Sequence, residues 1–505
     1  MKQFFNIYLW QIISLLTGFA TMFVVTPYLA SNQNYFGIYT FVLSLNLFLS
    51  YADFGFLNAG AKFASEAFAK NDRTSEENIL GFVCFILIAV FFLFGLGMLF
   101  FYFHPQYLLR GLHTSEDIKL ASGLFLAFTL SLPVLIAQRA IQLIFNIRLK
   151  DYLFQRIYSM LNLVKIAMVF LFFKGGSYHI ISYYIFIQAC TLCAVIIGCF
   201  IARSKFNYNF ARLLKAIRYN SDVYGTTKGL AFNSLFVTIS WVIYYELDSL
   251  IIGKFVGLKE VAIFSICISI MTLARSLYGI LYNPFSAKFN HFIGRNEQYK
   301  LELAFEKILI IGLPFSIIPT TVLILTMKGF IKSWVGLEYE SSIPVISIMF
   351  ASYYFTFLSN PTSIAMVALQ KVKDLYIISA ILPVIYWTGI IVSYRFLGLL
   401  SFSIFKLISF TISTVFYFYC SKRIFVVRWA DFFKRNILPA LATILILVLL
   451  SWAFNNFLPQ TKGKSELVIF VGIAMGYSIL GLIFYYFLSK SFRSVVYEVY
   501  ASLFA

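Results

Sequence analysis

Long apolar runs recur along the whole chain, separated by short segments that contain charged residues, glycine, proline or asparagine. Most runs reach about 20 residues, which is enough for an α-helix to cross the hydrocarbon core of a bilayer. A β-barrel would instead alternate apolar and polar residues over about ten positions, whereas "FVCFILIAVFFLFGLGMLFFYF" is apolar on all sides. The pattern predicts about fourteen transmembrane helices, over residues 4–30, 36–58, 79–103, 118–146, 152–174, 179–202, 226–256, 260–286, 302–328, 342–370, 375–397, 399–420, 435–457 and 466–489.

The first of these runs could be mistaken for a signal peptide. Its apolar part is longer than the about 7–15 residues of a signal peptide's core, and no small-x-small cleavage site follows it. We therefore expect residues 4–30 to form an uncleaved first transmembrane helix.

The composition makes lipid the solvent for most of the chain. Of 505 residues, 61% are hydrophobic and only 12% are charged, and the mean hydropathy is +0.84. A soluble protein of this length could not cover so much apolar surface, because about half of any folded surface faces water. The predicted fold class is therefore an all-α integral membrane protein.

Lysine and arginine collect in alternate loops. Two of the basic segments are "ARSKFNYNFARLLKAIRYN" and "SKRIFVVRWADFFKRN", and the formal net charge of the chain is +19. Because basic loops remain on the cytoplasmic side, this asymmetry predicts that both termini lie in the cytoplasm. The dispersal of the charge over many short loops argues against nucleic acid as a partner.

Three pairs of similar segments recur in order at a spacing of about 225 residues. Such an internal repeat predicts two pseudo-symmetric six-helix lobes, related by an axis along the membrane normal. The lobes are expected at residues 1–202 and 226–422, joined by a basic cytoplasmic linker at 203–225, with two further helices and a tail at 423–505. The paired segments are "YFGIYTFVLSL" (35–45) with "EVAIFSICISI" (260–270), "AKFASEAFAKND" (61–72) with "AKFNHFIGRNE" (287–297), and "RLKDY" (148–152) with "KVKDL" (371–375).

Three cations lie inside predicted helices: Arg275 and Lys165 near the middle of theirs, and Arg139 within a polar patch of span 118–146. An ionisable group at bilayer depth costs several kcal/mol, so each is a functional hypothesis. Lining of an internal passage is the first interpretation, and a structural ion pair is the alternative. Arg156 and Lys406 lie nearer to helix ends, where we expect their side chains to reach the interface.

Polar side chains accompany these cations at helical spacing. Arg139 shares a polar patch with Gln138, Gln142 and Asn146, and Asn162 lies one turn before Lys165. We expect Gln142, Asn146 and Asn162 to line the same passage. A second polar stripe, on predicted helix 36–58, is formed by Asn46, Ser50 and Asp53.

Acidic residues appear at bilayer depth as well, at Asp53, Glu246 and Asp248. Coupling to Na⁺ or H⁺ and a buried ion pair with one of the cations are the two interpretations, and the spacing leaves both open. Asp248 continues a polar and aromatic stripe that includes Trp241 and Tyr245 on predicted helix 226–256. We expect this stripe to face the passage or the other lobe.

The cysteines and histidines indicate no chemistry of their own. All six cysteines lie in apolar runs, and "CTLC" at Cys190–Cys193 lacks a neighbouring cluster of metal ligands. The four histidines are scattered. We predict no disulfide, no metal site, no catalytic residue and no cofactor apart from the coupling ion.

Residues 24–72 resemble the opening of polysaccharide exporters of the multidrug/oligosaccharidyl-lipid/polysaccharide (MOP) superfamily, and the likeness extends over nearly the whole chain. The resemblance rests on the proline that ends the first helix, the turn "YFGIY" (35–39), the segment Asp53–Phe54–Gly55 and the basic loop after it. "LDSLIIGKFVGLKEVAIFSICIS" (247–269) is similar to the start of the family's second lobe. The resemblance implies a MATE-like fold with twelve helices and two more.

This resemblance also implies a function. It implies a Wzx-type flippase that moves an undecaprenyl-diphosphate-linked oligosaccharide repeat unit, as in O-antigen, lipopolysaccharide or capsule assembly, to the outer leaflet of a bacterial cytoplasmic (inner) membrane. Alternating access through a cationic cleft, coupled to an ion gradient, would be the mechanism. Besides membrane lipid, a polysaccharide polymerase and a chain-length regulator are the expected partners.

Three alternatives to the flippase are open to a chain of this kind. A cation-coupled multidrug antiporter shares the fold, but the middle of helix 4–30 lacks the acid that proton-coupled members of that branch often carry. A major facilitator would carry a glycine-rich turn after its second helix, which "AGAKFASEAFAKNDR" lacks. A polysaccharide polymerase or ligase, the enzyme alternative, would carry a large outer loop, and the predicted outer loops are short.

Overall fold

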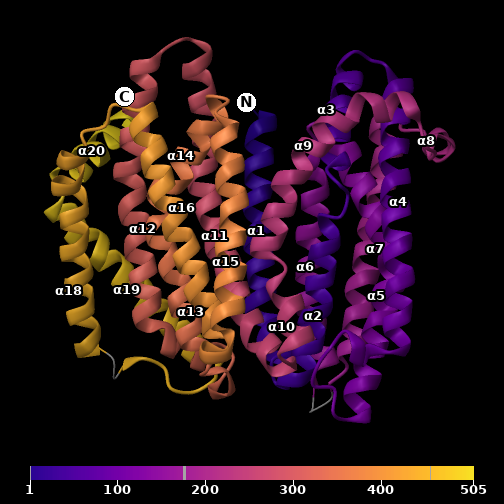
Figure 1. Cartoon of the computed structure of the whole chain (residues 1–505), viewed down its shortest axis with the longest axis horizontal. Coiled ribbons are helices and arrows are strands. Elements are labelled where there is room, and N and C mark those ends of the chain that lie inside the picture. Colours follow the sequence, from indigo (N-terminus) through magenta and orange to yellow (C-terminus); the bar gives the residue numbers. More distant parts are fainter. Residues whose placement is uncertain (1, 175–177, 455–456, 505) are drawn as a thin grey trace. The chain divides into compact units, whose positions relative to one another are not determined.

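The computed structural model describes residues 2–174, 178–454 and 457–504. Within these residues the regular structure is helical (Figure 1). Twelve of the helices there are long and apolar enough to cross a membrane, or thirteen if the bent pair α9 and α10 counts as one span. The predicted all-α membrane fold is confirmed, and the predicted count of about fourteen spans is close to the observed one.

The chain forms two compact units, Met1–Ser265 and Ile266–Ala505. These units are defined by internal contacts, so they do not test the predicted lobes at 1–202 and 226–422. In this division α9, α10 and the start of α11 belong to the first unit.

The first unit packs its long helices side by side. α1 pairs with α6, and α5 lies between α4 and α7 (Figure 1). The helices of this unit are α1 (Lys2–Leu29), α2 (Gln33–Ser50), α3 (Phe56–Ala69), α4 (Arg73–Phe103), α5 (Ser115–Ile147), α6 (Asp151–Phe172), α7 (Ile180–Phe206), α8 (Phe210–Ala216), α9 (Ser221–Tyr245) and α10 (Asp248–Phe255).

The second unit is centred on α12, which contacts α13, α14, α18 and α19, while α15 pairs with α16 (Figure 1). α11 runs through the boundary between the units as one continuous helix. The helices are α11 (Leu258–Gly294), α12 (Gln298–Trp334), α13 (Ser342–Ala351), α14 (Thr356–Ala368), α15 (Val372–Leu397), α16 (Leu400–Ile424), α17 (Trp429–Phe432), α18 (Leu438–Phe454), α19 (Lys464–Leu488) and α20 (Lys490–Phe504).

Side-chain caps fix several helix starts. The Asn32 side chain accepts from the Tyr35 backbone N–H at 3.1 Å, and the Asp72 side chain accepts from the Ser75 N–H at 3.0 Å. Thr114 begins α5 with a reciprocal capping box. Each cap satisfies a backbone donor that has no partner inside its helix.

One predicted span is broken in the structure. The expected helix 36–58 is divided into α2 and α3 by a turn over residues 51–55, in which Phe54 and Gly55 have φ angles of 52° and 77°. A side chain at Gly55 would place its Cβ 2.3 Å from the carbonyl oxygen of Ala231. The positive φ and this close contact both require glycine at the turn. The segment 61–69, expected in a loop, is helical because α3 continues through it.

Other predicted spans differ in smaller ways. Span 226–256 is bent by 48° between α9 and α10, and span 342–370 is divided into α13 and α14 by a short 3₁₀ segment. In span 435–457, residues 455 and 456 lie outside the described residues.

The helix boundaries repeat at the spacing found in the sequence. A shift of 225 positions carries the start of α2 onto the start of α11, the end of α3 onto the end of α11, and the start of α4 onto the start of α12. Asn71 and Asn296, also 225 positions apart, both have left-handed backbone, with φ of 57° and 55°. Asparagine tolerates this conformation better than most residues. The same turn therefore follows α3 and α11.

A buried ion pair lies at one end of the first unit. The Arg148 guanidinium is 2.7 Å from Glu76, and the two side chains are 5% and 1% exposed. Arg148 also donates to the Ile144 carbonyl at 3.0 Å and lies over the rings of Phe68 and Tyr208. This pair joins α4 to the end of α5 and was not predicted from the sequence.

All six cysteines are free thiols. Cys84, Cys190, Cys267 and Cys420 are buried, Cys199 is half-buried and Cys193, on α7, is exposed.

Candidate functional site

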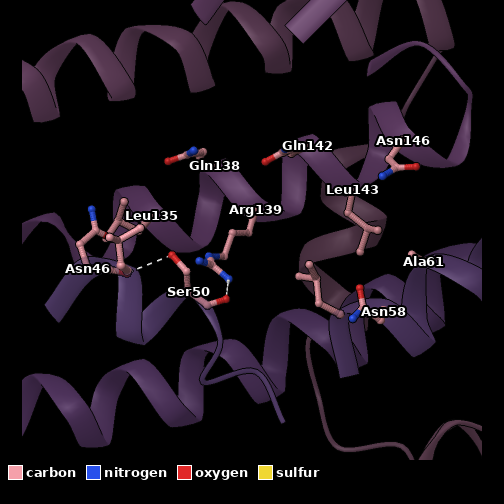
Figure 2. A pocket seen from close by; sticks show the side chains of 12 residues that line it. Asn46, Ser50, Asn58, Ala61, Leu135, Gln138, Arg139, Gln142, Leu143 and Asn146 are labelled. Carbon is pink, nitrogen blue, oxygen red and sulfur yellow. Dashed lines mark hydrogen bonds between the residues drawn. The ribbon is translucent and has the colours of Figure 1, made fainter. Parts of the chain in front are cut away.

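A polar cavity lies in the first unit, in contact with α2, α3 and α5. Its volume is about 410 Å³. Figure 2 shows its side chains converging from the three helices. The lining residues are Asn46, Leu47 and Ser50 of α2, Leu57, Asn58 and Ala61 of α3, and Leu135, Gln138, Arg139, Gln142, Leu143 and Asn146 of α5.

Helical spacing brings the polar groups of each helix to the cavity. Gln138, Gln142 and Asn146 are four residues apart on α5, so they lie along one face. Asn46 and Ser50 have the same spacing on α2. The polar patch of α5 and two members of the other predicted stripe, Asn46 and Ser50, thus line one cavity, whereas Asp53 does not. α3 adds Asn58, which was not predicted.

Arg139 is anchored at the break between α2 and α3. Its guanidinium donates to the Ser50 carbonyl at 2.7 Å, which satisfies one of the free carbonyls at the end of α2 (Figure 2). The guanidinium is also 5.8 Å from the centre of the Phe91 ring. Asp53 interacts electrostatically with Arg139 and accepts the Leu57 backbone N–H at 2.9 Å, at the start of α3. Arg139 therefore binds the end of α2, and Asp53 binds the start of α3.

The five carboxamides that line the cavity are Asn46, Asn58, Gln138, Gln142 and Asn146. Within the described residues, none of these side chains forms a hydrogen bond to the protein. They are half-buried or exposed rather than packed in the core. Their donors and acceptors are thus available to water or to a ligand in the cavity.

Lys165 and Asn162 lie together on α6, with Nζ of the lysine 3.4 Å from Oδ1 of the asparagine. Nζ is also 5.9 Å from the centre of the Tyr158 ring. Neither residue lines the cavity. Arg275 lies on α11 in the second unit, 3.5 Å from the hydroxyl of Thr272.

The predicted acids and aromatics of span 226–256 meet at its bend. Glu246 and Asp248 flank the break between α9 and α10 and are 8% and 1% exposed. Trp241 and Tyr245 lie one turn apart, with ring centres 4.2 Å apart. Roles of these residues in substrate or ion binding remain predictions.

No protein-family model matches the chain, and no curated protein matches it in sequence. Solved structures with a similar fold include the lipid II flippase MurJ in an inward closed conformation, with a TM-score of 0.65 and 17% identity over 96% of this chain and 98% of that one. The fold is that of MurJ and the MATE transporters.

Two further neighbours extend the likeness. An inward-facing MATE multidrug transporter of the MOP superfamily has a TM-score of 0.62 and 13% identity, over 81% of this chain and 94% of that one. A MOP superfamily transporter from Pyrococcus furiosus, described as having a binding pocket of reversed polarity, has a TM-score of 0.54 and 12% identity, over 84% and 95%. These neighbours are transporters and flippases of the MOP superfamily.

In this MurJ- and MATE-like fold, one sequence expectation was wrong. Lys406 does not extend to the interface, since it is 3% exposed on α16 and its Nζ lies 4.7 Å from the centre of the Tyr386 ring. Nearness to the end of an apolar run does not reveal whether a neighbouring helix covers the side chain. Arg156, by contrast, is exposed and lies over the Trp10 ring.

The fold also carries no evident metal centre. Across the described ranges, no group of three or more His, Cys, Asp or Glu side chains is placed to hold a metal ion. The chemistry that the cavity can supply is hydrogen bonding by carboxamides and one guanidinium.

Proposed function

We propose that this protein is a flippase for a lipid-linked oligosaccharide, an undecaprenyl-diphosphate-linked repeat unit of a surface polysaccharide such as O-antigen. It would move this substrate from the cytoplasmic to the outer leaflet of a bacterial inner membrane. Both chain termini would lie in the cytoplasm.

The polar cavity is the observation that carries this proposal. It contains Arg139 and five carboxamides, and the α5 span that supplies four of these polar side chains is apolar enough to cross a membrane. A polar head group cannot enter hydrocarbon without losing its hydrogen bonds, at a cost of several kcal/mol per group. A hydrated polar cavity at membrane depth removes that cost, while the prenyl tail can remain in lipid. The likeness to a lipid II flippase along almost the whole chain supports the same substrate class.

The cations would act on the diphosphate. Arginine binds phosphate oxygens with paired N–H groups, and lysine acts as a point charge. We assign this role to Arg275 and Lys165, and we assign alternating access to rocking of the two predicted lobes. Arg139 would line the passage that takes the rest of the head group. Asp53, Glu246 and Asp248 are the candidates for Na⁺ or H⁺ coupling. A polymerase and a chain-length regulator would act downstream.

A multidrug antiporter is the second candidate, favoured by the likeness to MATE transporters. The charge of the cavity argues against it, because Arg139 is its single charged residue among the described lining side chains, and a lone guanidinium repels cationic drugs. Transport of an organic cation by the purified protein, without movement of a lipid-linked glycan, would favour the antiporter.

The test is movement of a labelled undecaprenyl-diphosphate-linked oligosaccharide between the leaflets of vesicles that contain the purified protein. We expect wild-type protein to move the lipid and Arg275→Ala to abolish the movement while leaving insertion into the vesicles unchanged. Arg395→Ala, which removes an exposed cation from α15 of the same unit, is the matched control. A wild-type protein that leaves the lipid in place would overturn the proposal.

A further inference from the structure

We infer that the cavity formed by α2, α3 and α5 is a saccharide subsite, which binds hydroxyl and acetamido groups of the glycan through its carboxamides and does not bind the diphosphate. This inference rests on the proposed function and names the part of the substrate that this cavity takes.

The composition of the lining matches the hydrogen-bonding pattern of a sugar. Each carboxamide carries one oxygen that accepts and two N–H groups that donate. A sugar hydroxyl donates one bond and accepts others, so a carboxamide can bond to two adjacent hydroxyls. A phosphate oxygen only accepts, which would leave every carboxamide oxygen of the cavity without a partner.

These groups are free for such a ligand. No described residue of the protein bonds to the side chains of Asn46, Asn58, Gln138, Gln142 or Asn146, although all five line the same cavity. The carboxamides come from three helices, and Figure 2 shows those of Asn46 and Gln138 on one side of Arg139 and those of Asn58 and Asn146 on the other. A ligand in the cavity could therefore be bonded along its length.

The charge of the cavity argues against the diphosphate. Arg139 is the one charged side chain among the described lining residues, and its guanidinium already donates to the Ser50 carbonyl and interacts with Asp53. A single, partly compensated cation does not balance two phosphate groups. The volume of about 410 Å³ is at the lower end of the about 300–1,000 Å³ of small-molecule sites, so it suits part of an oligosaccharide.

The experiment compares the binding of two lipids to the purified full chain in nanodiscs. One probe is undecaprenyl diphosphate carrying a single N-acetylglucosamine, and the other is undecaprenyl diphosphate without sugar. The variants are Gln142→Leu and Asn46→Leu. Gln106→Leu is the control, since Gln106 is an exposed carboxamide of the same unit outside the cavity.

Loss of one or two neutral hydrogen bonds, at about 0.5–1.5 kcal/mol each, weakens binding by roughly 2-fold to more than 10-fold. We expect each cavity variant to lose affinity for the sugar-bearing lipid by that factor and to keep its affinity for undecaprenyl diphosphate. Gln106→Leu should change neither affinity.

Equal losses for both lipids, no loss for either, or no binding of the sugar-bearing lipid by wild-type protein would overturn the inference. Failure of the proposed function gives a different result. In that case wild-type protein binds the sugar-bearing lipid with the expected variant effects, but does not move it across vesicle membranes.

Discussion

The segment from α2 to α3 and the helix α11 occupy equivalent places in the sequence repeat, but only one of them is broken. Each covers 37 positions, Gln33–Ala69 and Leu258–Gly294, and each is followed by a left-handed asparagine. The first is interrupted over residues 51–55, whereas the second is helical throughout. The repeat preserves the ends of the element and leaves its middle free to diverge.

The break between α2 and α3 exposes a backbone carbonyl in the first unit, which the continuous helix α11 does not do at the equivalent position. At the end of α2 the Ser50 carbonyl is free of intrahelical partners and is bound by Arg139 from α5. The position 225 residues after Ser50 is Arg275. In the first unit, Arg139 of the neighbouring helix α5 binds the backbone at this position. In the second unit, α11 itself carries a cation at the equivalent position, Arg275.

One partner of the buried ion pair, the acid, has an apolar residue at the matching position of the second unit. Glu76 is replaced, 225 positions later, by Leu301, and both side chains are buried. Removing one partner from a buried pair leaves an uncompensated charge, so Arg148→Ala should reduce stability by about 3–5 kcal/mol. Thermal melting of the purified protein in detergent measures the effect.

The control for this prediction is the double variant Glu76→Leu with Arg148→Met, which replaces both partners by apolar side chains. An apolar replacement of both partners is commonly neutral or stabilising, so it should recover most of the loss. Equal melting temperatures for wild type and Arg148→Ala would show that the pair contributes little.

The break itself is tested by Gly55→Ala. The φ of 77° disfavours a side chain, at roughly 1–3 kcal/mol, and the new Cβ would collide with the Ala231 carbonyl of α9. We expect a lower melting temperature and weaker binding in the cavity that α2 and α3 line. Gly229→Ala on α9 meets no atom within 4 Å and should melt like wild type. If both variants melt alike, the break does not depend on this glycine.

The smallest expected effect concerns the starts of α4 and α12, where Asp72 and Glu297 are 225 positions apart. A hydrogen bond from the Ser75 N–H lowers the pKa of Asp72, and one from Lys300 lowers the pKa of Glu297. Each folded-state pKa is below its unfolded value of about 4, so each stabilisation is present above that pH and is lost as the pH falls further.

Asp72 caps a helix, whereas Glu297 forms an exposed ion pair. Asp72→Ala should therefore lower the melting temperature more than Glu297→Ala at neutral pH, and added salt should remove only the Glu297 effect. A larger effect at Glu297, or an Asp72 effect that vanishes in salt, would contradict this assignment.

The sequence was sufficient to predict the membrane fold because hydropathy reports the solvent of each segment. The hydropathy pattern did not predict the turn of residues 51–55, because "SYADFGF" is apolar enough to continue a span. The signal was present in Asp53 and Gly55, a helix-capping acid and a residue that tolerates positive φ.

The polar faces of the separate helices could be predicted from the sequence, but the cavity that they form together could not. Periodicity placed Gln138, Gln142 and Asn146 on one face of α5, and Asn46 with Ser50 on one face of α2. Nothing in one helix's periodicity states which other helix it faces, so their meeting required the structure. Asn58 was missed because it is the last residue of the predicted span 36–58, and α3 was not predicted as a separate helix.

The distribution of thiols makes water access to this cavity measurable. Four of the six native cysteines are buried, and thiols form the reactive thiolate poorly in apolar surroundings. Replacing Cys193 and Cys199 would leave a chain with little background labelling. A cysteine introduced at Asn146, which is exposed on the cavity wall, could then report to a water-soluble maleimide whether a bound substrate closes the cavity.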